Sequence, residues 1–189
     1  MSSDQTGARL PGEFGIWMFV AGDLVLFGLL FGTFQVYRLD GPAAYSQSSA
    51  MLNLTLGAVN TVLLLTSSYT VALGVHLARR ERWQGARTAL LAGLCCGIGF
   101  CVLKILEYAE KGQAGIGVGT DDFFMFFFVM TGIHLVHVLI GLGVLSFLWF
   151  YTSRRQGDAA VRSLESGATY WHLVDLLWIV LFAQLYLLR

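Results

Sequence analysis

Charge is scarce in this sequence of 189 residues, because Asp, Glu, Lys and Arg make up only 13% of it. A soluble domain carries roughly 25% charged residues. The few charges also balance, at 12 basic and 12 acidic residues, so no basic surplus is present to attract nucleic acid. Since 56% of the residues are hydrophobic, the composition excludes an ordinary soluble domain, argues against a nucleic-acid partner and favours a polytopic membrane protein.

Cysteine and histidine are few as well. Three cysteines, Cys95, Cys96 and Cys101, lie in one apolar run, where we expect small hydrophobic side chains rather than a disulfide framework or a metal site. The four histidines fall short of the roughly six that a haem-copper catalytic subunit needs for two haems and a second metal. The chain is therefore not expected to be such a subunit on its own.

Five apolar segments are each long enough to cross a bilayer core of about 30 Å, which needs roughly 20 helical residues. Only helices and closed barrels satisfy their backbone hydrogen bonds in lipid, so the sequence predicts an all-α bundle of five transmembrane helices in a single domain, 1–189. The spans are expected at about 14–36, 53–78, 88–110, 123–151 and 168–188. The connections, at 38–47, 79–87, 111–122 and 153–167, are too short to fold alone.

The N-terminus does not resemble a cleavable signal peptide, since its first twelve residues hold one cation, Arg9, and no small-residue cleavage site follows. Basic residues collect at the end of the bundle that carries this terminus: Arg9, Arg79, Arg80, Arg82, Arg87, Arg154, Arg155 and Arg162. The opposite end has three: Arg38, Lys111 and Arg189. The positive-inside rule then predicts a cytoplasmic N-terminus and a periplasmic C-terminus in a bacterial cytoplasmic (inner) membrane.

Small residues predict where the helices touch. Gly28 and Gly32 in the first span, and Gly93 and Gly97 in the third, have the four-residue spacing of a close-packing face, and Gly132 is a further small residue expected at a contact. A phenylalanine-rich run is expected to face lipid or the membrane interface instead: Phe123, Phe124, Phe126, Phe127 and Phe128.

Several polar residues lie inside the predicted spans, where a charge costs roughly 2.5 to 3.5 kcal/mol and so needs a partner, water or protonation. Asp23 lies halfway along the first span. Three further pairs have three-residue spacing and therefore share a helix face: Lys104 and Glu107, His134 and His137, His172 and Asp175. We expect Lys104 and Glu107 to pair with each other, and Tyr108 to hydrogen-bond a neighbouring helix.

Two interpretations of these groups compete. In the first they are interhelical hydrogen bonds, each worth about 0.6 kcal/mol, and His172 and Asp175 pair with His134 or His137 to lock the last two helices together. In the second they bind a metal, carry protons or coordinate a substrate. The Glu-x-x-His motif of di-iron bundles is absent from the sequence, which disfavours a metal site.

Motifs in all five spans resemble subunit III of the haem-copper respiratory oxidases, the family named for cytochrome c oxidase subunit III. They are Gly-Ile-Trp-Met-Phe at 15–19 leading to Gly22-Asp23, Asn-Thr-Val-Leu-Leu-Leu-Thr-Ser-Ser at 60–68, Glu107-Tyr108, Thr-Gly-Ile-His-Leu-Val-His-Val at 131–138 and Tyr-Trp-His-Leu-Val-Asp-Leu-Leu-Trp at 170–178. The last two are the most specific.

This resemblance implies a subunit without catalytic residues, haem or metal of its own, packed beside a catalytic partner that carries the haem and any copper or iron. Members of the family stabilise the complex and hold phospholipid between their helices, and some help to sustain proton uptake. Longer members have seven spans, and the five here look like the last five, as in the shorter quinol-oxidase form.

Departures from the oxidase pattern indicate a branch. Gly22-Asp23 replaces the usual Ser-Glu, Lys104 replaces a common Gln, and the chain opens with Leu-Pro-Gly-Glu at 10–13. These features resemble the NorE-type branch associated with nitric oxide reductase, so the sequence leaves open whether the partner reduces oxygen or nitric oxide. The alternative to an accessory subunit is a small proton or solute transporter that uses the intramembrane Asp, Glu and His residues.

Overall fold

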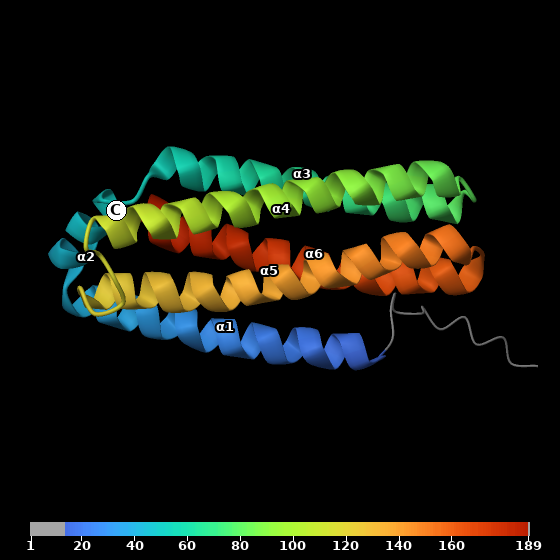
Figure 1. The fold of residues 1–189 in the computed structure, drawn as a ribbon. Coiled ribbons are helices and arrows are strands. Elements are labelled where there is room, and N and C mark those ends of the chain that lie inside the picture. Colours follow the sequence, from blue (N-terminus) through green and yellow to red (C-terminus); the bar gives the residue numbers. More distant parts are fainter. Residues whose placement is uncertain (1–13, 189) are drawn as a thin grey trace, which may run out of the picture.

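The computed structural model describes residues 14–188, and this part of the chain contains helices and no strand (Figure 1). Five helices in it are long and apolar enough to cross a membrane, which confirms the predicted all-α, five-helix architecture. They are α1 (Phe14–Asp40), α3 (Leu54–Arg79), α4 (Trp83–Gln113), α5 (Asp122–Arg154) and α6 (Asp158–Phe182). Two short elements complete the chain, the helix α2 (Pro42–Ala50) and a π-helical turn, η1 (Ala183–Leu187). Arg9, Arg189 and residues 10–13 lie outside the described residues.

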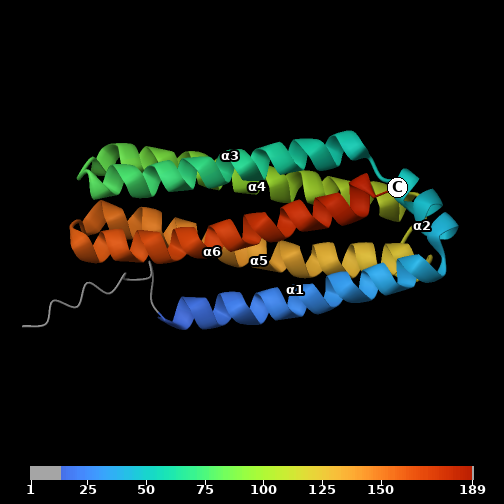
Figure 2. The ribbon, with the colours of Figure 1, turned by 180° about the vertical axis from the view of Figure 1, so that it is seen from behind.

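Successive long helices run in opposite directions, so the connections between them lie alternately at the two ends of the bundle (Figures 1 and 2). One end holds the start of α1 and the turns α3–α4 and α5–α6, and we call it the cationic end for its arginines: Arg79, Arg80, Arg82, Arg154 and Arg155. The other, the α2 end, holds α2, the α4–α5 loop and η1. Helix α6 packs against α1, α3 and α5, whereas α1 lies outermost, on α5 and α6.

Two predicted connections are shorter than expected, because each contains a helix. Residues 42–50 form α2 within the first connection, and α6 begins ten residues before the predicted fifth span. The early part of α6 has an apolar face, on which Ala160 and Leu164 are buried, and a charged face that lowers its average hydropathy. Gly157, at φ 101°, allows the sharp entry into this helix, because residues with a Cβ rarely adopt that conformation.

Four of the five phenylalanines at the start of α5 are buried, and the prediction that they face lipid is wrong, whereas Phe128 is only partly buried. Phe123, Phe124, Phe126 and Phe127 are all at most 6% exposed. Their rings pack edge-on against aromatic rings of other elements: Phe34 of α1 against Phe126, Tyr45 of α2 against Phe123, and Tyr108 of α4 against Phe127. Hydropathy alone does not distinguish lipid from protein as the neighbour of an apolar side chain, and here protein surrounds α5 on several sides.

The predicted glycine contacts divide into two groups. A Cβ on Gly93 would lie 2.9 Å from Val71 of α3, and one on Gly97 would lie 2.8 Å from Leu142 of α5, which confirms both as close helix contacts. Around Gly28, Gly32 and Gly132, by contrast, no atom of another described helix lies within 4 Å of such a Cβ. The prediction is therefore wrong for these three glycines as contacts within the chain, since α1 turns Gly28 and Gly32 outward.

Replacing Gly97 with Ala should destabilise the chain, because the new Cβ would lie 2.9 Å from the ring of Trp171, which is 1% exposed and has no room to move. Overpacking of this kind costs about 1–3 kcal/mol. Gly99→Ala is the matched control on the same helix, since its Cβ would meet Leu63 at an ordinary 3.6 Å. Thermal unfolding in detergent should show a lower midpoint for Gly97→Ala alone, and equal midpoints would contradict the packing described here.

Candidate functional site

A closed triad of hydrogen bonds lies in the core near the α2 end. Lys104 Nζ donates to Glu107 Oε2 at 2.7 Å and to the hydroxyl oxygen of Tyr186 at 3.0 Å. The same hydroxyl group donates to Glu107 Oε1 at 2.7 Å. All three side chains are at most 1% exposed. The predicted pairing of Lys104 with Glu107 is thus confirmed, with Tyr186 as a third member.

Four aromatic rings surround the ammonium group of Lys104. Its Nζ lies 4.7 to 5.6 Å from the ring centres of Phe127, Trp178, Tyr186 and Tyr108. At such distances the negative face of a ring attracts a cation, by about 2 kcal/mol where water is excluded. The rings come from α4, α5, α6 and η1, so the single cation joins four elements of the bundle.

Tyr186 reaches the triad because α6 continues into η1, whose wider π-helical turn shifts the last side chains relative to the α-helix. Gly57 of α3 makes room for the tyrosine, since a Cβ there would lie 2.8 Å from the Tyr186 ring. The sequence gives no sign of this residue's role, because 79 positions separate Tyr186 from Glu107 and no motif includes it.

Tyr108 makes the contact between helices that the sequence predicts. Its hydroxyl oxygen lies 2.6 Å from Thr131 Oγ1 of α5, and either group can donate. Thr131 is fully buried and belongs to the motif at 131–138. This hydrogen bond lies beside the triad and joins α4 to α5 a second time.

Asp23 pairs with a histidine of a different helix. Its Oδ1 lies 3.2 Å from His137 Nε2, and His137 Nδ1 lies 2.8 Å from the carbonyl oxygen of Ile133. Asp23 is 7% and His137 9% exposed, and the edge of Phe27 packs on the imidazole ring. The pair is a polar link between the outermost helix, α1, and α5.

The two contacts of His137 indicate which of its ring nitrogens carries a proton. A carbonyl oxygen only accepts, so Nδ1 carries a proton and donates it to Ile133. The Nε2–Asp23 contact is then a hydrogen bond only if one further proton lies between the imidazole and the carboxyl group. A pair that holds this proton has no net charge, which suits a site enclosed by apolar helices.

His134 lies one helical turn from His137 and has different surroundings. Its ring stacks on Trp178 at 5.5 Å and meets the edge of Phe100 at 5.9 Å. Neither ring nitrogen has a hydrogen-bond partner among the described residues, and the side chain is fully buried. Trp178 in turn donates to Thr61 of α3, so His134 packs against a ring that is itself fixed.

His172 and Asp175 face α3 and not the histidines of α5. His172 Nδ1 lies 2.6 Å from Ser68 Oγ. Asp175 is 4% exposed, and its Oδ1 has no partner among the residues that the structure describes. The prediction that these two side chains pair with His134 or His137 is therefore wrong, because α6 turns this face toward α3 while His137 turns toward α1.

Other hydrogen bonds, which join α3 to α6 and to α4, were not expected from the sequence. Trp171 Nε1 donates to Ser67 Oγ at 3.1 Å, and Ser67 Oγ donates to the carbonyl oxygen of Gly93 at 2.8 Å. The tryptophan and the serine both belong to the motifs quoted above, so the sequence did single out these residues. The motifs do not indicate which residues of distant helices bond to each other.

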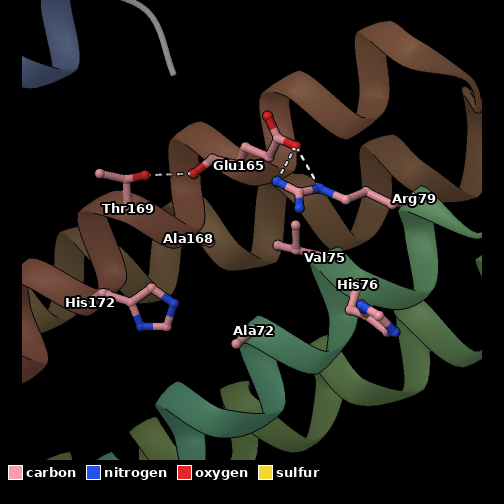
Figure 3. A pocket seen from close by; sticks show the side chains of 8 residues that line it. All are labelled: Ala72, Val75, His76, Arg79, Glu165, Ala168, Thr169 and His172. Atoms are coloured by element: carbon pink, nitrogen blue, oxygen red, sulfur yellow. Dashed lines mark hydrogen bonds and ion pairs between the residues drawn. The ribbon is translucent and has the colours of Figure 1, made fainter. Parts of the chain in front are cut away.

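A cavity of about 210 Å³ opens between α3 and α6 toward the cationic end (Figure 3). At one side Arg79 Nη2 forms an ion pair of 2.8 Å with Glu165, and His172 and His76 also line the space. The arginine side chain is 57% exposed, so this pair contributes less than about 1 kcal/mol. Within residues 14–188, no group of three or more His, Cys, Asp or Glu side chains could hold a metal ion.

The chain is similar to known proteins over nearly its whole length. The family model described as "Cytochrome c oxidase subunit III" matches residues 5–189. "Quinol oxidase subunit 3" of Bacillus spizizenii is 31% identical over 175 residues, which are 92% of this chain and 85% of the relative. "Cytochrome c oxidase subunit 3" of a Synechocystis species is 32% identical over 210 residues, covering 100% of this chain and 85% of the relative. "Probable quinol oxidase subunit 3" of Staphylococcus aureus is 27% identical over 177 residues, or 93% of this chain and 88% of the relative.

The triad predicts a characteristic pattern of stability in a double-mutant cycle. Lys104→Met leaves a buried carboxylate without its cation, and Glu107→Gln leaves a buried ammonium without its anion, so each should cost about 3–5 kcal/mol. The double variant removes both charges and should be more stable than either single variant, as chemical unfolding in detergent would measure. Arg79→Met with Glu165→Gln is the exposed control pair, with costs below about 1 kcal/mol. Additive losses at Lys104 and Glu107 would contradict a coupled pair.

Proposed function

The chain belongs to the cytochrome c oxidase subunit III family, and from this membership we propose that it is a non-catalytic subunit of a haem-copper terminal oxidase in the bacterial cytoplasmic membrane. Its role is to bind beside the catalytic subunit and stabilise the assembled complex during respiratory electron transport. The haem and any copper or iron then belong to the partner.

The observation that carries this proposal is that two pairs of intramembrane charged groups contact each other inside the bundle. Lys104 pairs with Glu107, and Asp23 pairs with His137, in contacts that lie inside the bundle. A transporter exposes such groups to a solute path between two conformations. Here they join helices, which favours a structural subunit over the transporter alternative, for which the comparisons give no support.

The oxidase assignment rests on the relatives. Those reported above are named for quinol or cytochrome c oxidases, which supports an oxygen-reducing partner. The association with nitric oxide reductase, inferred from Asp23, Lys104 and residues 10–13, has no such support.

The orientation follows from the described basic residues. Seven arginines lie on the side of the cationic end, whereas Arg38 and Lys111 lie toward the α2 end. By the positive-inside rule we place the cationic end and the N-terminus in the cytoplasm.

The outward face of α1 is the proposed contact with the catalytic subunit. Gly28 and Gly32 lie on it with open space around them, beside the exposed side chains of Val25, Leu29 and Val36. Two glycines at this spacing let another helix approach closely. The contact that is missing within the chain would therefore form between chains.

A phospholipid is proposed to bind in a second groove of about 520 Å³ between α1, α5 and α6. Apolar side chains from these helices line it, among them Phe19, Ile140 and Phe147. An acyl chain matches this lining, and arginines at the cationic end supply positive charge for a phosphate group.

Co-purification tests the subunit role and the proposed face together. In mild detergent at native expression, the tagged chain should recover a haem-containing partner, measured by absorption spectra. Gly28→Leu with Gly32→Leu should leave the thermal stability of the isolated chain unchanged and release the partner, whereas Gly143→Leu, at an equally open position of α5, should retain it. Recovery of the wild-type chain without haem would contradict the subunit role, and retention by the double variant would contradict only the face.

Removal of the chain tests the absence of a catalytic role. Complexes assembled without it should keep their haem absorption and their initial rate of acceptor reduction, because none of the reacting groups is proposed to lie in this chain. They should lose activity sooner on warming, which a time course at raised temperature would measure. An intact haem spectrum with no initial turnover would overturn the non-catalytic assignment.

A further inference from the structure

A third cavity, of about 380 Å³, lies at the α2 end and has a different lining from the two described above. The end of α1, helix α2 and the start of α5 form its walls. Its lining combines three carboxylates with aromatic rings: Asp40, Asp121, Asp122, Tyr37, Tyr45 and Phe123. Gly41 and Ala44 also line the cavity, and because both residues are small they leave its interior open.

No cationic side chain of the described residues is paired with the three carboxylates. None forms an ion pair with another described residue. Asp121 accepts hydrogen bonds from Ser48 Oγ at 2.6 Å and from the backbone N–H of Phe124 at 2.7 Å, both neutral donors. Asp40 and Asp122 are exposed. The cavity is therefore a strongly negative site with ordered walls.

Tyr45 supplies an independent sign of a ligand. The residue is 6% exposed, and its ring is held edge-on between Phe34 and Phe123. Its hydroxyl oxygen is buried and has no hydrogen-bond partner among residues 14–188. Burial, together with the charges of Asp122 and Asp121, raises the pKa of Tyr45 to about 12, so the phenol keeps its proton at neutral pH. A buried hydroxyl group at the wall of a polar cavity is costly unless something in the cavity binds it.

The chemistry of the walls selects the kind of cation. The three carboxylates do not form a metal-binding group, since no cluster of three or more His, Cys, Asp or Glu in the described residues could hold a metal ion. Aromatic faces together with separated carboxylates suit an organic ammonium group, which is larger than a metal ion and is attracted to rings as well as to charge. A primary ammonium also offers three N–H donors to the carboxylates and to the phenol oxygen.

We propose that this cavity binds a primary ammonium group, carried by the ethanolamine head of a phospholipid or by a free amine. The depth of the site fits both sources. Asp40 ends the long apolar helix α1, and Asp122 directly precedes the apolar run of α5, so the cavity lies at the level of the lipid head groups. This proposal does not depend on the oxidase partner.

Native mass spectrometry of the delipidated full chain in detergent provides the first test. Phosphatidylethanolamine and phosphatidylglycerol with identical acyl chains are offered together, and the ethanolamine lipid should be retained in preference. Free ethanolamine should displace it, whereas ethylene glycol, which has no amine, should not. Binding of free ethanolamine without any preference for the lipid would assign the site to a soluble amine.

Variants locate the binding. Asp40→Asn with Asp122→Asn should weaken retention by about tenfold or more, as expected when a charge-assisted hydrogen bond is lost. Asp158→Asn changes an exposed carboxylate at the opposite end of the bundle and should have no effect. Tyr45→Phe removes only the hydroxyl group and should also weaken binding. Thermal unfolding of each variant verifies that it is folded.

Two results would overturn the proposal. One is equal retention of the two lipids together with no binding of ethanolamine by the wild-type chain. The other is wild-type binding by both Tyr45→Phe and the double Asp variant, which would place any amine elsewhere. If the double Asp variant fails to fold, the binding measured for Tyr45→Phe decides between these outcomes, because this substitution leaves the packing of the ring unchanged.

Discussion

A charged group inside a bilayer has to be balanced by the protein itself, and the arrangement of this bundle depends on how Lys104 is balanced. The ammonium group needs Glu107 of its own helix, the hydroxyl group of Tyr186 from η1 and four aromatic faces. These partners are available only if α4, α5 and α6 meet at one level. The triad thus selects one axial register of three helices, whereas apolar packing alone would tolerate several.

The remaining polar contacts attach the other helices to this core. Helix α6 is tied to α3 by Trp171, Trp178 and His172, each through a hydroxyl group of α3. Helix α1 is linked to α5 through the contact of Asp23 with His137, beside which the ring of Phe27 packs. The bundle therefore has a firmly connected part, α3 to α6, and a helix at its edge with a largely uncovered face.

The sequence predicted the features that depend on composition and local spacing. The five spans follow from apolar length, and the Lys104–Glu107 pair follows from three-residue spacing on one helix. It failed where the answer depends on which surfaces meet. The phenylalanines of α5 are buried because protein, not lipid, surrounds them, and His172 bonds to Ser68 because α6 presents that face to α3. Tyr186 and Tyr45 gave no signal, since their roles arise only when distant segments come together.

The short contact between Asp23 and His137 also determines how this helix link responds to an energised membrane. A membrane potential changes the energy of one charge by about 2.3 kcal/mol per 100 mV when the charge crosses the whole bilayer. A proton that moves within the 3.2 Å contact crosses at most about a tenth of a core some 30 Å thick, or about 0.2 kcal/mol per 100 mV. The contact that attaches α1 is consequently almost insensitive to the membrane potential.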